Sequence, residues 1–459
     1  MSFIADKQTT DDLNLLGKYK PGSIYNLFNK VKTRGGERLL DDMFRNPLSD
    51  PQQINERSDI FRYLGSKPIA FPFSGEQFGL IEDYLGTGGS GFFLTTAASL
   101  LRKRLLEVTI KDKKYEAIRE GVRVTVGFLR GCREFIGQFE EDATGIGKGS
   151  PGFVEEAPGL LREKVASVKA ILDDKRLAAL PREEQMASLP WQKLAGIHHL
   201  FVQTLQEELS RLCETLYYFD LYIAVSRVAA EKGFSYAQAL PEDEYIFHAL
   251  DLRHPCLDKA VGNPVMLDQH RNVLFLTGAN MAGKSTFMKS FGIALYLAHM
   301  GFPVAARGMV FSIKEGMYTS INVPDNLSMG YSHFYAEVQR VKTIAEEVSK
   351  PRSLLVIFDE LFKGTNVKDA YDATLAVTAA FAEYRNCGFI ISTHIIEVGE
   401  TLREQYDNLH FMYLPTVMDD KTPRYTYRLT DGITSDRHGM MIIEQEGIID
   451  IIKTGSSQH

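Results

Sequence analysis

The sequence predicts an all-helical region followed by an α/β domain with a parallel sheet, and two observations lead to this division. From about residue 94 to residue 230, apolar residues recur at helical spacing. They include Leu200, Leu205, Leu209, Leu212 and Leu216. After Pro241, short apolar runs alternate with helical stretches, which is typical of parallel strands joined by crossover helices. We therefore expect one domain over residues 1–240 and a second over residues 241–459.

The composition is that of an ordinary soluble protein. The chain has 459 residues, and at roughly 150 residues per domain this length suits two or three domains. Apolar residues make up 44% and charged residues 24%, which excludes a largely disordered chain and a collagen-like repeat. With 52 basic and 59 acidic side chains the formal charge is −7, which argues against coating of nucleic acid by bulk charge. The net charge does not exclude a local basic face that binds nucleic acid.

Cysteine usage and the N-terminal residues indicate an intracellular location. The four cysteines lie far apart and form no C-x-x-C pair, so we expect reduced thiols and no zinc site. The first residues, MSFIADKQTTDD, have neither the basic start nor the apolar core of a signal peptide. The longest apolar stretch, residues 291–306, is interrupted by His299 and is too short to span a bilayer. We expect a soluble cytoplasmic protein without a membrane partner.

Two glycine-rich runs interrupt the helical half. Residues 86–91 (GTGGSG) and 144–152 (TGIGKGSPG) could approach a phosphate, but no apolar strand leads into either run. Flexible joints are therefore the favoured interpretation. Between the two runs, from Arg102 to Arg133, basic side chains outnumber acidic ones. A solvated helix face and contact with a phosphate backbone both explain this pattern.

A phosphate-binding motif lies in the α/β half. The apolar run 273–276 leads into residues 277–286 (TGANMAGKST), which have the G-x-x-x-x-G-K-[ST] spacing and a helical pattern after them. In such a loop, backbone N–H groups and the helix N-terminus face the phosphate oxygens. Lys284 would supply a positive charge, and the Ser285 hydroxyl would ligate Mg²⁺. The other candidate contacts are Gly278, Ala279, Asn280, Met281, Ala282, Gly283 and Thr286.

Two further apolar runs end in polar residues. Residues 353–358 lead into Asp359, which would orient the metal, and Glu360, which would polarise the attacking water. An Asp-Glu pair at a strand end is otherwise typical of a surface turn, but behind a phosphate loop it favours a nucleotide hydrolase. A third run leads into His394, at the edge where open parallel sheets bind ligands. A γ-phosphate sensor is favoured there over a structural histidine.

Longer motifs carry a resemblance to a known family. The loop is similar to T-G-P-N-M-G-G-K-S-T, with Ala279 and Ala282 substituted. Residues 325–337 (DNLSMGYSHFYAE) are similar to D-x-L-x-x-G-x-S-T-F-x-x-E, and residues 359–369 (DELFKGTNVKD) to D-E-I-G-R-G-T-S-x-x-D. Further matches are Arg253-His254-Pro255, Thr393-His394, Tyr427 to Gly432, and His438-Gly439. The chain thus resembles the MutS family of DNA mismatch-repair ATPases over most of residues 20–450.

The resemblance implies an α/β P-loop (ABC-like) ATPase domain preceded by an all-α core and lever domain. It implies ATP and Mg²⁺ as cofactors, a homodimer that closes over two nucleotides, and double-stranded or structured DNA held by the helical core. Ser332, in the signature motif, would reach the partner's γ-phosphate in trans. The catalytic candidates are Glu360, His394, Ser332 (in trans) and Asn280. Tyr427 would stack on the base, because the family's aromatic residue before the loop has no equivalent here.

Departures from the family leave several functions open. The core pattern begins within the first thirty residues, so we expect a short form that lacks the N-terminal mismatch-recognition domain. Phe362 and Lys363 replace the family's glycine and arginine. The first function is a MutS-like ATPase that switches a DNA-embracing core, in mismatch repair or related processing of DNA structures. The second is a nucleotide-gated dimeric scaffold for protein partners. The third, a transporter-type ATPase subunit, is disfavoured because the helical region precedes the ATPase domain.

Overall fold

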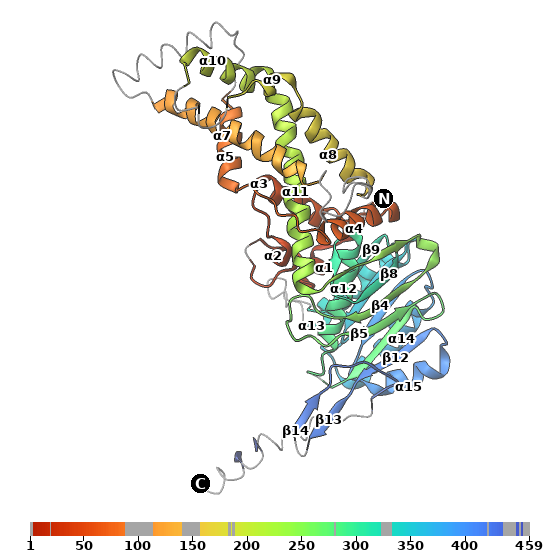
Figure 1. The fold of residues 1–459 in the computed structure, drawn as a ribbon. Helices are drawn as coiled ribbons and strands as arrows, with labels where there is room; N and C mark the ends of the chain where they lie inside the picture. Colours follow the sequence, from red (N-terminus) through yellow and green to blue (C-terminus); the bar gives the residue numbers. More distant parts are fainter. Residues whose placement is uncertain are drawn as a thin grey trace. The chain divides into compact units, whose positions relative to one another are not determined.

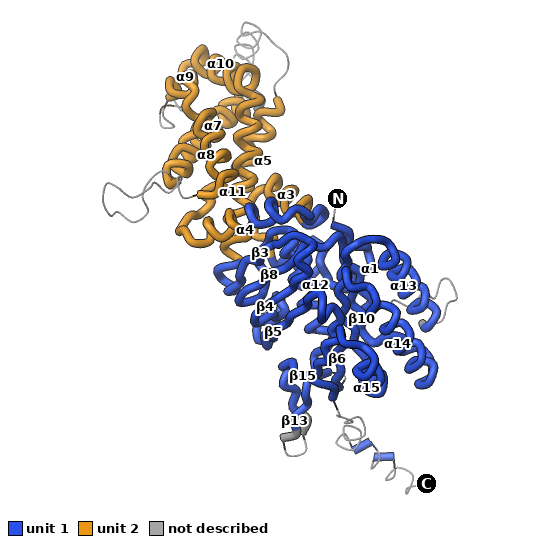
Figure 2. Tube along the Cα trace, turned by 90° about the vertical axis from the view of Figure 1, so that its right-hand side faces the viewer, with its two compact units in different colours: residues 1–27, 44–58, 229–459 blue, residues 28–43, 59–228 orange. Residues whose placement is uncertain are grey.

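The computed structural model describes residues 3–18, 20–87, 113–139, 157–181, 185, 189–279, 281–322, 333–419, 422–434, 447–448 and 451–452. The chain forms two compact units, which Figure 2 distinguishes by colour. Unit 1 comprises residues 1–27, 44–58 and 229–459, and unit 2 comprises residues 28–43 and 59–228. The sequence pattern predicts one helical domain over residues 1–240, whereas the structure groups residues 1–27 and 44–58 with the α/β half.

Unit 1 is built around a sheet of seven strands in the order β1-β9-β10-β11-β6-β12-β15. The strands are β1 (Ile4–Ala5), β6 (Val273–Gly278), β9 (Gly316–Ser320), β10 (Leu354–Asp359), β11 (Gly388–Ser392), β12 (Leu409–Leu414) and β15 (Thr430–Asp431). Neighbours run parallel except β15, which is antiparallel to β12, so the predicted parallel sheet is confirmed. Because Ile4 of β1 pairs with Gly316 of β9, the N-terminal residues fold with unit 1.

Helices cover both faces of this sheet (Figure 1). They are α12 (Lys284–His299), α13 (His333–Val348), α14 (Val367–Ala382) and α15 (Ile396–Gln405). α12 contacts β6 and β10, whereas α13, α14 and α15 contact β9, β11 and β12 respectively. Successive side chains of each strand point to opposite faces of the sheet. Val273 and Phe275 join the core cluster that includes side chains of α13, α14 and α15, while Ile357 approaches Gly292 of α12.

A second sheet packs against the other side of α12. Its order is β3 (Gln238–Leu240), β8 (Gly308–Ser312), β4 (Phe247–Leu252) and β5 (Asn263–Leu267). Phe247 of β4 stacks on Phe291 of α12 with ring centroids 3.9 Å apart. α12 is therefore buried on both sides, which explains why almost all its side chains are inaccessible to water. Two short strand pairs complete the strands of unit 1. They are β2 (Ser235–Tyr236) with β7 (Pro303–Val304), and β13 (Thr416–Asp419) with β14 (Thr422–Tyr425). The remaining elements are helix α1 (Lys7–Asp12) and the turn η3 (Glu242–Glu244).

Unit 2 is helical, as the sequence predicts. Its elements are α5 (Gly75–Leu85), α7 (Lys113–Gly137), α8 (Gly159–Leu172), α9 (Lys175–Ala178), α10 (Trp191–His199), the π-helical turn η2 (Leu200–Thr204) and most of α11 (Gln206–Lys232). The divisions between units fall inside α2 (Ile24–Phe28), α3 (Arg34–Arg45), α4 (Pro51–Gly65) and α11. Aromatic side chains form its core, where Phe73, Phe78 and Phe128 have ring centroids 5.1–5.9 Å apart. Among the described residues, no helix is both long and apolar enough to cross a bilayer.

Candidate functional site

The candidate site lies at the edge of the main sheet where its parallel strands end. β6 ends at Gly278, β10 at Asp359 and β11 at Ser392. β11 lies between the other two strands, with Asp359 paired to Ser392 and Ser392 paired to Leu276. The loop after β6 and the carboxylates after β10 therefore leave the sheet from the same edge, which is the usual ligand-binding edge of such sheets.

The lysine of the loop lies directly between the loop and the carboxylates. Lys284 is the first residue of α12 and is only 4% exposed. Its Nζ donates to the carbonyl oxygens of Gly278 (2.8 Å) and Ala279 (3.3 Å). The same Nζ lies 3.8 Å from Oε1 of Glu360. The structure thus brings together the two motifs that the sequence identifies 76 positions apart, at Lys284 and Glu360.

Glycine conformations allow this lysine to fold back toward its own loop. Gly278 has a φ of 139° and Gly283 a φ of 104°, which side chains with a Cβ rarely adopt. Burial lowers the pKa of Lys284, and the negative charges of Glu360 and Asp359 oppose that effect. A triphosphate at this position would add negative charge beside the amine and would stabilise its protonated form.

A serine that the sequence analysis did not single out fixes the two carboxylate residues. The Ser392 hydroxyl donates to Oδ1 of Asp359 (2.6 Å) and accepts from the backbone N–H of Glu360 (3.2 Å). The Ser392 carbonyl accepts from the same N–H at 3.1 Å. Glu360 has a φ of 58°, an uncommon conformation for a residue other than glycine. These bonds hold the backbone in that conformation and direct the Glu360 carboxylate toward Lys284.

A cavity of about 340 Å³ lies on the other side of the loop. It is lined by loop residues 281–283, the start of α12, Leu414 and Tyr427. Residues between Leu252 and Asn263, the first residue of β5, also contribute to its walls. Asn263 closes one wall, because its side chain donates to the Tyr427 carbonyl (2.9 Å) and accepts from the Leu429 N–H (2.7 Å). The Tyr427 ring lies so close to Gly283 that a Cβ there would be 3.0 Å from it. Sequence reasoning found Tyr427 but missed Asn263.

The other predicted residues lie in different environments. Ser285 and Thr286 are exposed, Ala282 is buried, and Met281 is 77% exposed. His394 is exposed just after β11, where the described hydrogen bonds come from Ser392 and Thr393. Asn280 and Ser332 lie outside the described residues. The loop serine and the carboxylates thus have defined positions, whereas the structure gives no geometry for the two catalytic candidates Asn280 and Ser332.

The donor set suits a magnesium ion better than a transition metal. No group of three or more histidine, cysteine or acidic side chains in the described part of the chain could enclose a metal. Mg²⁺ needs no such enclosure, because it binds through one or two protein oxygens together with waters and phosphates. The Ser285 hydroxyl and the half-buried Asp359 carboxylate supply oxygens of that kind. These residues therefore fit a nucleotide-bound magnesium ion.

Comparisons with known proteins show which proteins the chain is similar to. The family model for MutS domain V matches residues 274–458, which include β6 after Val273, the loop, Lys284 and both carboxylates. The DNA mismatch repair proteins MutS of Leuconostoc mesenteroides and Petrotoga mobilis are each 24% identical to this chain, over 98% of its length. Residues 274–458 thus match MutS domain V, and the chain as a whole is similar to MutS proteins. The MutS protein of Pseudothermotoga lettingae is 22% identical, again over 98% of the chain.

The similarity extends over almost all of this chain but over only part of each MutS protein. The chain spans 61% to 63% of the length of these three MutS proteins. The domain V match contains all of the main sheet except β1 and Val273, the first residue of β6. Ser392, Asp359 and Tyr427 therefore lie inside it. Asn263 lies outside it, eleven residues before the match begins.

Proposed function

We propose that this chain, which is similar to MutS proteins, binds and hydrolyses Mg²⁺-ATP at the loop 277–286, in a P-loop ATPase domain. The observation that carries the proposal is the 3.8 Å approach of Lys284 Nζ to Glu360 Oε1. For hydrolysis of a bound triphosphate, a cation aimed at the phosphates and a carboxylate able to activate water must face the same site. Their meeting at the ligand-binding edge of a parallel sheet supports a hydrolytic site rather than a chance motif.

Each residue of the site has a distinct role in this proposal. ATP phosphates would replace the carbonyls of Gly278 and Ala279 as partners of the Lys284 amine, while backbone N–H groups of the loop hold the phosphates. Glu360 would accept a proton from the attacking water, and His394 would contact the γ-phosphate. Ser285 and Asp359 would hold Mg²⁺, which neutralises charge on the phosphates when bound.

The nucleoside would occupy the neighbouring cavity. Its volume of about 340 Å³ suits a small-molecule ligand, and it opens beside Gly283 at the start of α12. Leu257, Val261 and Leu414 supply apolar walls, and the half-exposed Tyr427 ring supplies a stacking surface. Asn263 would act by holding the Tyr427 segment, since its side chain bonds two backbone groups there.

For the whole protein we propose a dimeric, nucleotide-switched ATPase that acts on double-stranded or structured DNA. The names of the relatives support a role in DNA mismatch repair. In this proposal Ser332 of one chain completes the site of its partner.

The variant Lys284→Ala tests the proposed ATPase chemistry, and it should weaken ATP binding and abolish hydrolysis. Lys342→Ala, an exposed lysine on α13, is the matched control and should keep parental activity. Equal hydrolysis by both variants would refute the assignment.

A protein-binding scaffold is the second candidate, and the basic residues of α7 favour it. Arg123 is paired with Glu120 of its own helix at 2.5 Å, and Arg133 donates to the Leu172 carbonyl. These two cations are therefore engaged within unit 2, and the predicted basic residues 102–104 lie outside the described residues. Titration with duplex DNA at several salt concentrations separates the two functions. DNA binding predicts that log affinity falls with log salt by about 0.9 per neutralised phosphate, and a scaffold predicts no binding.

A further inference from the structure

A turn with an unusual backbone conformation follows Asp359 and carries the proposed general base. We call residues 360–364 the Glu360 turn. Glu360 has a φ of 58° and Phe362 a φ of 59°, values that glycine adopts far more readily than other residues. Residues in this conformation cost free energy and persist only where surrounding contacts hold them. The similar MutS motif, D-E-I-G-R-G-T, has glycine at position 362, so the contacts of the phenylalanine in this chain must offset that cost.

The side chain of Phe362 anchors the Glu360 turn in the core. It is only 4% exposed and belongs to the apolar cluster that includes side chains of α13, α14 and α15. Its ring meets the ring of Phe334, in the first turn of α13, with centroids 6.1 Å apart and planes at 60°. Gly364 packs on the same residue, because a Cβ there would lie 2.9 Å from the Phe334 backbone nitrogen. The Glu360 turn therefore lies directly against the start of α13.

Two other elements hold the backbone of the Glu360 turn. The N–H of Glu360 donates to the carbonyl (3.1 Å) and the hydroxyl (3.2 Å) of Ser392, on β11. The carbonyl of Leu361 accepts from the hydroxyl of Thr374, on α14, at 3.3 Å. Both Ser392 and Thr374 are fully buried. Hydrogen bonds thus fix Glu360 and Leu361 through the backbone, and Phe362 adds a hold through its side chain.

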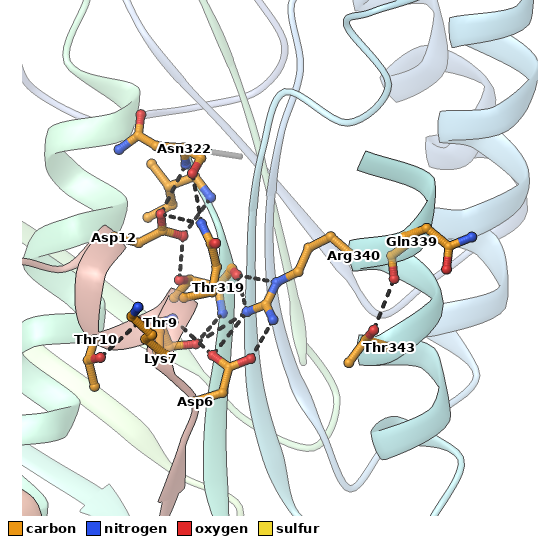
Figure 3. A network of polar contacts seen from close by, with 12 residues as sticks. Asp6, Lys7, Thr9, Thr10, Asp12, Thr319, Asn322, Gln339, Arg340 and Thr343 are labelled. Carbon is orange, nitrogen blue, oxygen red and sulfur yellow. Dashed lines mark hydrogen bonds and ion pairs between the residues drawn. The ribbon is translucent and has the colours of Figure 1, made fainter. Parts of the chain in front are cut away.

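The helix that receives this ring is itself tied to the sheet. Figure 3 shows Arg340 of α13 reaching toward Asp6 and Thr319. The guanidinium forms an ion pair with Asp6, and its Nε donates to the carbonyl of Thr319, on β9, at 2.9 Å. Burial alone would raise the pKa of Asp6, but hydrogen bonds from Arg340 and Thr9 outweigh it, and the pKa is lowered. Asp6 is therefore charged at neutral pH, and α13 offers Phe362 a fixed surface.

We propose that Phe362 is a positioning residue for Glu360 and keeps its carboxylate facing Lys284. The inference rests on the proposed ATPase site, in which Glu360 activates the attacking water. Burial of the ring against α13 offsets the cost of the left-handed conformation at position 362, so the Glu360 turn does not relax. A small displacement of a general base slows the chemical step more than it weakens substrate binding. Phe362 thus acts through the backbone of the turn and not through contact with the nucleotide.

Three substitutions of Phe362 separate this hold on the backbone from simple packing. Phe362→Ala removes the ring and leaves a residue for which the left-handed conformation is costly, so the turn can relax. Phe362→Gly removes the same ring, but glycine adopts this conformation readily. We expect kcat for ATP to fall about tenfold in Phe362→Ala and about threefold in Phe362→Gly, with the Kd for ATP within about twofold of the parental value. Phe362→Leu keeps an apolar group against Phe334 and should stay within about twofold of the parental kcat.

A control and a second background complete the experiment. Phe389→Leu shortens another buried ring of the same cluster, near the start of β11, and should keep the parental kcat. If Phe362 acts through Glu360, adding Phe362→Ala to Glu360→Gln should slow hydrolysis less than about twofold further. Single-turnover hydrolysis measures each rate, and thermal unfolding shows which variants are folded. Phe334→Ala, which removes the partner ring, replaces Phe362→Ala if that variant does not fold.

The outcomes of this experiment are distinct. A slower Phe362→Ala than Phe362→Gly, with the effect lost in the Glu360→Gln background, supports the positioning role. If Phe362→Gly is as slow as Phe362→Ala, or if Phe362→Ala keeps the parental kcat, the positioning role is overturned and the ATPase site stands. An equal fold decrease in both backgrounds also overturns the positioning role. If Glu360→Gln itself hydrolyses ATP at the parental rate, the proposed site is wrong and the inference falls with it.

Discussion

The Ser392 hydroxyl donates to the Asp359 carboxylate at 2.6 Å, and this bond joins the ends of two neighbouring strands. Because the same hydroxyl accepts from the Glu360 N–H, one side chain orients both acidic residues of the proposed site. Ser392 is fully buried, so no water can take its place without rearrangement of the strand ends. The geometry of the carboxylates therefore depends on a third strand, β11, that carries no acidic residue at this edge.

Ser392→Ala should slow hydrolysis more than it weakens ATP binding. The change removes the bond to Asp359 and leaves that carboxylate and the strained Glu360 backbone less well held. We expect kcat to fall about tenfold with a KM for ATP within about twofold of the parental value. Steady-state kinetics measure both numbers. Ser349→Ala, at an exposed position after α13, is the control and should be neutral. An unchanged kcat for Ser392→Ala would show that β11 does not orient the acids.

Asn263→Asp should weaken nucleotide binding without changing the chemical step. Aspartate keeps the acceptor for the Leu429 N–H but loses the donor to the Tyr427 carbonyl, and it places a negative charge beside the cavity. We expect the Kd for ATP to rise about tenfold, with kcat at saturating ATP close to parental. Asn26→Asp removes a similar donor, to the Lys20 carbonyl, and should leave the Kd unchanged. A parental Kd for Asn263→Asp would remove this cavity from the nucleotide site.

Much of the site could be predicted from the sequence because its motifs are local. The strand, loop and helix around Lys284 are contiguous, and Asp359 and Glu360 directly follow an apolar run. The partners that complete the site are distant in sequence. Asn263 bonds a segment 164 positions later, and Ile4 pairs with Gly316. No local pattern indicates such pairings, so the sequence alone places the N-terminal residues in the helical half and shows Ser392 only as part of a strand.

His299 should make the stability of unit 1 depend on pH. Its Nδ1 bonds the Leu48 carbonyl and its Nε2 accepts from the Lys314 N–H, so the buried ring is neutral. Complete burial lowers the pKa of His299 to about 4, from 6.5. The unfolded chain binds this proton below pH 6.5 and the folded chain does not, so stability is full above pH 6.5 and falls as the pH drops toward 4.

The loss over that interval should amount to about 3 kcal/mol in the free energy of unfolding. Denaturant titrations at pH 7, 6, 5 and 4 measure it. His299→Gln, which cannot take up a proton, should show a smaller decrease across the same interval, although its stability at pH 7 is lower. His270→Gln, at an exposed position, should show the parental decrease. Identical pH profiles for His299→Gln and the parent would contradict this assignment.

The separation of ATP binding from hydrolysis in Glu360→Gln is the decisive measurement. The amide keeps the size of the side chain near Lys284 but cannot accept the proton of the attacking water. We predict that ATP binds with a Kd within about threefold of the parental value, while single-turnover hydrolysis slows about a hundredfold or more. Glu383→Gln, an exposed acid at the end of α14, should hydrolyse ATP at the parental rate. Hydrolysis by Glu360→Gln at the parental rate would contradict the proposed site, because the carboxylate beside Lys284 would then not activate the water.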